Sequence, residues 1–310
     1  MKFKKFKNTR LLLRFIQALF SFNRKTKIKR LEMSNFHIEN LIFKLKIEEA
    51  CNDTKYRSEL MFIREYGPTM FPYKQIKPSP QFDSGIDANN HLPYVVHQGK
   101  KLFFPQSYPL ELCRKMYKSY IDTECLLGGN YREKSPHQYQ KDDFCINDGD
   151  ILVDVGCAEA LLSLDVIEKV SKVYLLETDK DWIHALEETF KSYRNKVVII
   201  NKYVSGVDSD STITLKTVLK DDVGKPLFVK MDIEGAETDV LNGSKEFLKE
   251  AYNIKIACCT YHRQDDADTI EKIYNEIGFH YEYSDGYILF SLDPNQKPPY
   301  FRHGIIRGWK

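Results

Sequence analysis

The stretch Ile151-Leu152-Val153-Asp154-Val155-Gly156-Cys157-Ala158-Glu159-Ala160-Leu161 decides how this chain folds. Its apolar run ends in an acid and a glycine, and apolar residues with helical spacing follow over 161–170. This order predicts a buried parallel strand, a tight turn and a helix. Asp154 is expected at the end of the strand, facing the crevice where open α/β sheets bind ligands. The single glycine alone is a weak nucleotide signal, because a plain core strand gives the same pattern.

Strand-like and helix-like segments alternate through the rest of the chain. They predict a Rossmann-like doubly wound α/β sheet, mostly parallel, with right-handed crossovers. Segments 279–283 and 287–291 flank the turn Ser284-Asp285-Gly286 and predict a terminal antiparallel hairpin. The other expected strands are 151–155, 173–177, 197–201, 227–232 and 254–260, and the expected helices are 181–194, 236–250 and 267–277.

The first half of the chain has a different pattern. It predicts an amphipathic helix within 35–66, a Pro- and Gly-rich loop over 67–93, a hairpin over 92–105 and a helix over 110–120. We therefore divide the chain into a basic segment (1–34), a mainly helical region with a hairpin that faces the substrate (35–147), and a ligand-binding domain (148–310).

The charge of the chain is unevenly distributed. Residues 1–30 hold 11 Lys/Arg and no Asp/Glu, which leaves 35 Lys/Arg against 44 Asp/Glu, a net charge of −9, for the rest. A nucleic-acid binder carries its basic surface on the folded domain, so this distribution argues against that function. The 7 Cys form no CxxC pair and favour reduced thiols, which indicates a cytoplasmic protein.

The basic segment also has an apolar face. In a helix, Leu12, Phe15, Ile16 and Leu19 share one side, and the apolar run is too short to span a bilayer. This pattern predicts peripheral binding of residues 1–30 to an anionic membrane, which places the protein at its inner face. A basic terminus without regular structure explains the same residues equally well.

Two further sets of charged residues follow later strands. Glu177 ends the second strand, where an acid accepts hydrogen bonds from the two hydroxyls of an adenosine ribose. The block Lys230-Met-Asp-Ile-Glu-Gly-Ala-Glu237 closes the fourth strand. Its charges are costly on an apolar strand unless they are paired or used. A structural Lys–Asp pair would explain them, but we favour a functional role, because the block abuts the same crevice edge as Asp154.

Together these residues resemble the FkbM-type S-adenosylmethionine-dependent methyltransferases. The resemblance covers about residues 148–291 and depends on Asp154-Val155-Gly156, Glu177, the 230–237 block and Leu241-Asn-Gly243. It implies the class I methyltransferase fold, with methyl transfer from S-adenosylmethionine to a hydroxyl of a sugar, polysaccharide or natural product. The cofactor-binding residues implied are Asp154, Gly156, Ala158, Glu159, Glu177 and Asp232. The family often has glycine at Ala160, where a methyl group would crowd the methionine end of the cofactor.

Methyl transfer to an alcohol also needs a base, because the acceptor loses a proton. His262 follows the fifth strand and has a suitable intrinsic pKa, and Asp232 is the competing base. Glu234 lies in the same block and completes the predicted catalytic set of Asp232, His262 and Glu234. The same three side chains are also hard-ion ligands, but nothing in their spacing requires a metal, and we predict none.

Two other functions fit part of the sequence. A nicotinamide-dependent oxidoreductase on the same fold explains Gly156 and Glu177 but not the 230–237 block. An inactive methyltransferase-like module that binds a partner or a membrane would explain Ala160 and the basic first segment.

Overall fold

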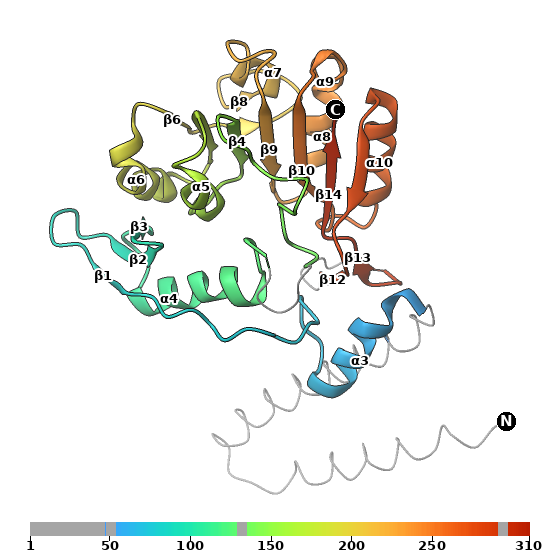
Figure 1. Cartoon of the computed structure of the whole chain (residues 1–310), viewed down its shortest axis with the longest axis horizontal. Coiled ribbons are helices and arrows are strands. Elements are labelled where there is room, and N and C mark those ends of the chain that lie inside the picture. The colour runs from blue at the N-terminus through green and yellow to red at the C-terminus, as the bar shows by residue number, and fades with distance from the viewer. Residues whose placement is uncertain (1–46, 48–53, 129–134, 291–296) are drawn as a thin grey trace, which may run out of the picture.

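The computed structural model describes residues 47, 54–128, 135–290 and 297–310 (Figure 1). The amphipathic helix expected in residues 1–34 lies outside this part of the chain, as does most of 35–53. Within the described residues, none of the helices has the length and apolar character needed to cross a bilayer.

The centre of the protein is a seven-stranded sheet in the order β11-β14-β10-β9-β4-β5-β6. The core strands β10, β9, β4, β5 and β6 are parallel, and β14 runs antiparallel to both of its neighbours. The predicted Rossmann-like sheet is therefore confirmed. The strands are β4 (Ile151–Val155), β5 (Lys172–Leu176), β6 (Val197–Ile200), β9 (Leu227–Met231), β10 (Ile254–Cys259), β11 (His280–Tyr283) and β14 (Ile305–Trp309).

Helices cover both faces of this sheet. Successive residues of a strand point to opposite faces, so Leu152 and Phe228 pack on one side while Val153 and Val229 pack on the other. The first face is covered by α5 (Leu161–Val166) and α6 (Lys180–Thr189), with the 3-10 turn η3 (Lys191–Tyr193) after them. The second face is covered by α7 (Leu215–Val218), α8 (Glu237–Gly243), α9 (Lys245–Glu250) and α10 (Asp266–Ile277).

The expected helix 236–250 is two helices, α8 and α9, that meet at Ser244. Gly243 at the end of α8 lies directly against Gly206, and a Cβ on Gly243 would overlap the Gly206 backbone. The glycine of the Leu241-Asn-Gly243 motif therefore permits a close backbone contact. That contact fixes α8 against the loop between the short parallel strands β7 (Tyr203–Val204) and β8 (Thr212–Ile213).

The antiparallel pair at the end of the sheet differs from the expected one. β11 pairs with β14 and not with the described residues 287–290 of the expected partner. Ile288–Leu289 forms β12, which pairs with β13 (Phe301–Arg302) in a separate small sheet. Burial of β14 on both faces explains why it is the strand that pairs with β11. Ile305 and Ile306 are neighbours on β14, and they point into the two cores on opposite faces of the sheet.

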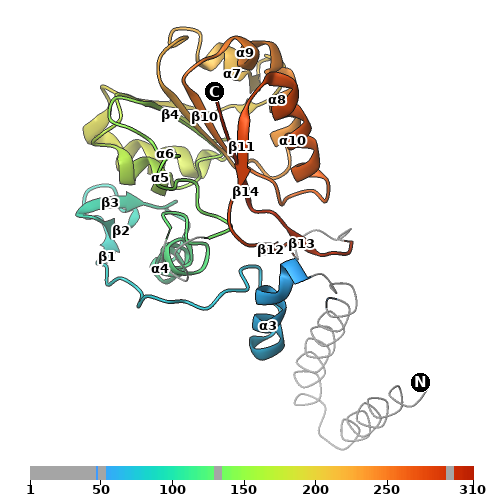
Figure 2. The same cartoon turned by 45° about the vertical axis from the view of Figure 1, so that its right-hand side comes forward.

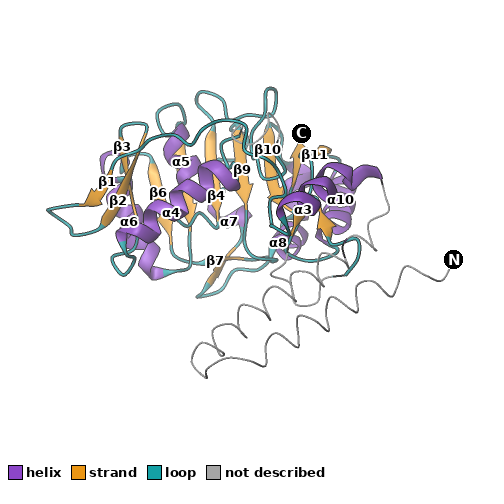
Figure 3. Ribbon diagram, turned by 90° about the horizontal axis from the view of Figure 1, so that it is seen from below, coloured by secondary structure: helices purple, strands orange, loops and turns teal. Residues whose placement is uncertain are grey.

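The N-terminal half packs below the sheet and beside its first face (Figure 2). The expected hairpin and helix are present as β2 (Pro93–His97), β3 (Lys100–Phe103) and α4 (Leu110–Lys118), and β1 (Ser84–Ile86) adds a third strand inside the expected loop. A π-helical turn, η2 (Ser119–Thr123), continues α4. Before them, η1 (Thr54–Tyr56) and α3 (Arg57–Tyr66) pack against β12 and β13. Figure 3 views this lower side of the protein.

The turn after β4 depends on Gly156. Its φ is +70°, and the Gly156 and Cys157 amides both donate to the Leu176 carbonyl. A Cβ at Gly156 would overlap the backbone carbonyl of Asp232. Glycine is therefore required both by the left-handed backbone and by the close approach of the loop after β9.

We expect Gly156→Ala to lower the free energy of unfolding by at least about 3 kcal/mol, because the overlap with Asp232 forces the two loops apart. Gly278→Ala is the matched control, since Gly278 is also left-handed at φ +75° but has open space around it. The control should cost only about 1 kcal/mol of backbone strain. Urea unfolding of both variants measures the difference. Equal losses would mean that the Gly156–Asp232 approach is not needed.

Candidate functional site

A cavity of about 480 Å³ lies at the carboxyl ends of β4, β9 and β10. The loop after β4 forms one wall, and Asp232, Glu234, Tyr261 and His262 form the second. The third wall comes from the N-terminal half, through residues 69–71, five residues between 119 and 126, His137 and Tyr139. The structure therefore brings the predicted residues Asp154, Gly156, Ala158, Glu159, Asp232, Glu234 and His262 to one cavity.

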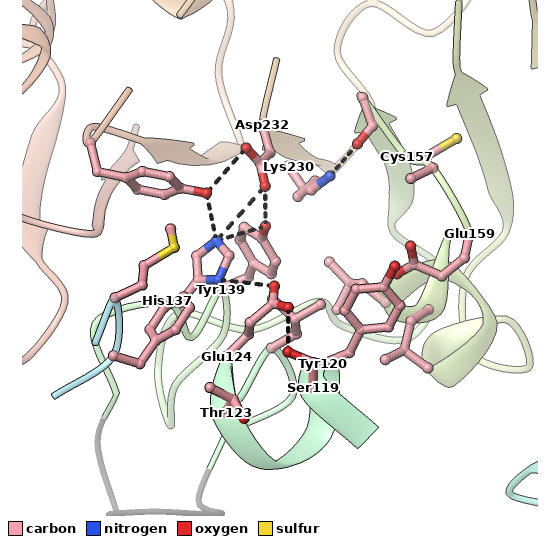
Figure 4. A pocket seen from close by; sticks show the side chains of 18 of the residues that line it. Ser119, Tyr120, Thr123, Glu124, His137, Tyr139, Cys157, Glu159, Lys230 and Asp232 are labelled. Carbon is pink, nitrogen blue, oxygen red and sulfur yellow. Dashed lines mark hydrogen bonds and ion pairs between the residues drawn. The ribbon is translucent and has the colours of Figure 1, made fainter. Parts of the chain in front are cut away.

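Lys230 joins the two central strands beneath this cavity (Figure 4). It lies opposite Asp154 in the β4–β9 register, and its ammonium is 3.2 Å from Asp154 Oδ1 and donates to the Gly156 carbonyl at 2.6 Å. Ser163 Oγ donates to the other Asp154 oxygen at 2.7 Å. Asp154 is thus inside β4 rather than at its end, and its carboxylate is already paired. The structural Lys–Asp pair is present, but it joins two strands rather than neighbours within the 230–237 block.

Glu177 lines a second cavity, of about 280 Å³, which shares Gly156, Ala158, Asp232 and Glu234 with the first. Its Oε2 accepts from the Ala158 amide at 2.9 Å, and its Oε1 accepts from the amides of Thr178 and Asp179. The Thr178 hydroxyl also donates to Oε1 at 3.5 Å, so the remaining acceptor capacity is on Oε2, which has only the Ala158 amide as a donor. Glu177 therefore also holds the loop after β4 in place.

That loop has an unusual backbone. Ala158 and Ala160 have φ of +43° and +59°, and with Gly156 they give three left-handed residues at alternate positions. The Ala160 methyl group packs in the core beside Leu161 and Leu162, whereas Ala158 lines the cavity. The expected crowding of the cofactor by Ala160 therefore does not occur, because its side chain points into the core. What remains at Ala160 is backbone strain, which glycine would relieve.

Glu159 is a buried acid between these residues, and Figure 4 shows the Tyr120 ring beside it. Burial raises the pKa of Glu159 to about 7, and the nearby carboxylates of Glu124 and Asp154 contribute in the same direction. Its backbone hydrogen bonding and the more distant Lys230 ammonium offset only part of this shift. Glu159 is therefore poised to gain or lose a proton near neutral pH.

We expect the free energy of unfolding to fall as pH rises from 4.5, the ordinary pKa of Glu159, through about 7. The folded protein keeps this proton in that range, whereas the unfolded chain releases it. Glu159→Gln should abolish this loss and should stabilise the ligand-free protein at pH 8 by on the order of 2–3 kcal/mol. Urea unfolding near pH 5 and pH 8 tests this, with the exposed Glu187→Gln as control. A Glu159→Gln protein with the pH dependence of the unsubstituted chain would contradict the shift.

Asp232, directly after β9, is the centre of the second wall. The Tyr139 hydroxyl donates to its Oδ2 at 3.0 Å, and the Tyr261 hydroxyl donates to Oδ1 at 3.5 Å. Burial acts to raise the pKa of Asp232, but the His137 imidazole, the Lys230 ammonium and His262 hold it well below its usual range. Asp232 is therefore an ionised hydrogen-bond acceptor, which makes it a weak base.

His262 lies between two carboxylates. Its Nε2 is 3.3 Å from Asp232 Oδ1, and its Nδ1 is 2.9 Å from Glu237 Oε1, an ion-pair distance without hydrogen-bond alignment. Burial acts to lower the pKa of His262, but Glu237 and Asp232 outweigh it and raise the pKa above its ordinary value. Glu234, by contrast, is 88% exposed at the rim, with Oε2 3.7 Å from the same ring. A protonated His262 compensates the charges of Asp232 and Glu237.

His137 was not among the residues predicted from the sequence. It is fully inside the site, with Nε2 3.2 Å from the Tyr261 hydroxyl and Nδ1 3.9 Å from Glu124 Oε2 (Figure 4). The Phe71 ring stacks on it, with 5.6 Å between ring centroids. Tyr139, Tyr261 and Glu124 were missed with it, because they come from segments that have no motif of their own.

The backbone around His137 is fixed by the end of the chain. The Ser284 hydroxyl donates to the Pro136 carbonyl at 2.7 Å, and Arg307 on β14 donates to the carbonyls of Gln138 and Tyr139. The unexpected strand β14 therefore positions two side chains of the cavity. Sequence spacing gave no signal of this contact, since about 170 residues separate the partners.

Among the residues that the structure describes, two groups of three side chains have ligand atoms within 4.8 Å of one another. One is His137, Asp232 and Cys259, and the other is Asp232, Glu237 and His262. The second differs from the alternative set considered from the sequence, because Glu237 takes the place of the exposed Glu234. The pKa of Cys259 is raised well above its ordinary value by burial and by Asp232, which disfavours the thiolate that a metal needs.

Comparison with known proteins identifies the family to which this chain belongs. Residues 115–287, more than half of the chain, match the family model described as "Methyltransferase FkbM domain". A comparison with curated protein sequences found no match.

Solved structures of methyltransferases are similar in fold. A crystal structure of methyltransferase FkbM from Methylobacillus flagellatus KT has 19% identity and a TM-score of 0.41, over 53% of this chain and 44% of that chain. This chain thus matches less than half of that protein. Precorrin-6y C5,15-methyltransferase from Geobacter metallireducens GS-15 has 14% identity and a TM-score of 0.36, over 53% and 82% of the two chains. Trm5b from Pyrococcus abyssi has 14% identity and a TM-score of 0.35, over 73% and 61%.

Proposed function

This chain belongs to the FkbM methyltransferase family, and we propose that it transfers a methyl group from S-adenosylmethionine to a hydroxyl group of a sugar, polysaccharide or natural-product acceptor. The observation that carries the proposal is the pair of adjoining cavities, which meet at Gly156, Ala158, Asp232 and Glu234. They give one continuous site with Glu177 at one end and the His137–Asp232 cluster at the other.

The residues present fit S-adenosylmethionine. Glu177 is available for the ribose hydroxyls, while Gly156, which no side chain can replace, leaves space where the two cavities join. At the join, the wall carries Asp232 and Glu234, whereas Lys230 is already shared between Asp154 and Gly156. This excess of acid suits a cofactor that carries a sulfonium and an ammonium group.

When bound, S-adenosylmethionine supplies an electrophilic methyl group on a positively charged sulfur. The chain's own contribution is to hold the acceptor in line with that group and to keep water out. Asp232 keeps its negative charge in this region, and Tyr139 and Tyr261 fix the direction of its carboxylate. The apolar side chains of Met70, Phe71 and Phe290 close the acceptor end.

The nicotinamide-dependent oxidoreductase is the weaker alternative. The chain belongs to a methyltransferase family, and the ionised Asp232, which lines both cavities, would repel the pyrophosphate of a dinucleotide. An inactive module on the same fold would bind S-adenosylhomocysteine without methylating any acceptor, so turnover separates it from an enzyme.

We expect Glu177→Ala to weaken S-adenosylhomocysteine binding by about tenfold to a hundredfold, since an acceptor for two hydroxyls is worth on the order of 1.5–3 kcal/mol. Calorimetry measures the affinity, and thermal unfolding checks that the loop held through Ala158 remains folded. The exposed Glu187→Ala is the control and should bind normally. Unchanged affinity of Glu177→Ala would remove Glu177 from the ribose site, and no binding by the unsubstituted protein would refute the proposed function.

We also propose that residues 1–30 bind the protein to anionic membranes. The support is in the sequence, where 11 Lys/Arg flank a short apolar run and no acid is present. Charge and a short apolar face together are sufficient for peripheral binding. A membrane location would suit a lipid-linked glycan acceptor.

We expect the full chain, but not a chain that begins at residue 31, to cosediment with phosphatidylserine-containing vesicles. The binding should be lost at roughly 0.5 M NaCl, where charges are screened beyond about 4 Å. Neutral phosphatidylcholine vesicles are the control. Equal sedimentation of the two chains would exclude this role of residues 1–30.

A further inference from the structure

The hydroxyls around His137 determine which of its nitrogens carries the proton. Tyr139 has one hydroxyl proton and donates it to Asp232 at 3.0 Å, so its oxygen faces His137 Nε2 as an acceptor at 3.4 Å. Asp232 Oδ2 itself lies 3.8 Å from Nε2, and the Tyr261 oxygen lies 3.2 Å from it. Both the Tyr139 oxygen and the Asp232 carboxylate favour a donor at Nε2, so we place the proton of the neutral ring there. This assignment follows from the hydrogen-bond network.

The other nitrogen is then an acceptor without a donor. His137 Nδ1 is buried and has no hydrogen-bond partner among the described residues. Its nearest charged neighbour is Glu124 Oε2 at 3.9 Å, and the other Glu124 oxygen already accepts from Ser119 Oγ at 3.0 Å. Burial raises the pKa of Glu124, which favours its protonated form. A hydroxyl group in the gap between the two residues, about 2.8 Å from both atoms, would then donate its single proton to Nδ1 and accept one from Glu124 Oε2.

The surroundings of the gap suit an alcohol on a carbon ring. Phe71 stacks on His137, Phe290 packs against Tyr261, and Met70 also lines the cavity. These side chains offer apolar contact to C–H groups, while Ser119 and Thr123 offer hydroxyls for further polar contacts. No Lys or Arg other than Lys230 lines this cavity in the described part of the chain, which disfavours a phosphate or carboxylate at this position.

We infer that His137 Nδ1 and Glu124 together bind the nucleophilic hydroxyl of the acceptor, and that His137 is the base that removes its proton. This inference rests on the proposed function. The acceptor oxygen forms a bond to the methyl carbon as the carbon–sulfur bond breaks, and the electron pair of that bond stays on sulfur. The hydroxyl proton passes to Nδ1. Asp232, on the Nε2 side of the ring, stabilises the positive charge that His137 gains.

His262, the base predicted from the sequence, is less suited to this role. Both of its nitrogens lie against carboxylates, Asp232 on one side and Glu237 on the other. Glu237 and Asp232 raise the pKa of His262 and favour its charged form, which has no free lone pair for an incoming proton. We assign it a positioning role, in which it balances the charges of Asp232 and Glu237.

The protonation of His137 can be observed without knowing the acceptor. We expect nitrogen NMR of the ¹⁵N-histidine-labelled full chain, with S-adenosylhomocysteine bound at pH 8, to show His137 with a protonated Nε2 and an unprotonated Nδ1. The His137→Gln spectrum assigns the signal, and the exposed His184→Gln checks that other signals stay in place. A proton on Nδ1, in a neutral or a charged ring, overturns the inference.

Turnover gives a second and independent measurement. With a radiolabelled methyl donor and a panel of methyl glycosides and amino sugars, His137→Gln should lower the rate about 10²–10⁴-fold. Glu124→Gln should lower it by about tenfold, and the surface variant His184→Gln should not change it. S-adenosylhomocysteine affinity should stay within about twofold in all three, which shows that the variants fold. A His137→Gln enzyme with full activity, or methylation of amines alone, overturns the inference, whereas failure of the unsubstituted chain to bind S-adenosylhomocysteine overturns the proposed function.

Discussion

The buried ion pair between Lys230 and Asp154 is the interaction on which the rest of the site depends. It joins the two central strands at one register position, and the same ammonium donates to the Gly156 carbonyl. Burial acts to lower the pKa of Lys230, but Asp154 and Asp232 outweigh it and keep the ammonium charged. Removing either partner would leave an unpaired charge in the core, which typically costs 3–5 kcal/mol. The same lysine therefore links the pairing of β4 with β9, the conformation of the loop after β4 and the net charge beneath the cavity.

The Lys230 ammonium is one positive charge, whereas several acidic side chains lie around it. This difference in charge determines how the side chains of the cavity pair. Lys230 is committed to Asp154, so Asp232 takes its partners from Tyr139, Tyr261 and His262 instead. These partners lie on the side away from the loop after β4. The result is a division of the site, with acids toward the proposed cofactor end and hydroxyl and imidazole groups toward the proposed acceptor end.

The sequence predicted the part of the site that lies in contiguous motifs. An apolar run marks each of the strands that precede Gly156, Glu177 and the 230–237 block. These runs and the charged residues that follow them were sufficient to predict the sheet and the residues at the carboxyl ends of its strands. His137, Glu124 and Tyr261 have no such pattern. His137 is positioned through β14, because Arg307 and the neighbouring Gly304 contact residues 136–139. The true partner of β11 was missed for the same reason, since a nearer apolar run at 287–291 fitted a hairpin equally well.

The two ends of the proposed site also differ in how much of their lining lies inside the residues that match the family. The match over 115–287 includes the loop after β4, Asp232, His137 and the π-helical turn with Glu124, but it excludes residues 69–71. Met70 and Phe71 are nevertheless fixed, because the Leu289 amide donates to the Met70 carbonyl and Phe71 stacks on His137. A segment outside the shared domain thus covers the residue that we assign as the base. It follows that changes in the N-terminal half can alter which acceptor fits the cavity while the cofactor side and the proton acceptor remain the same.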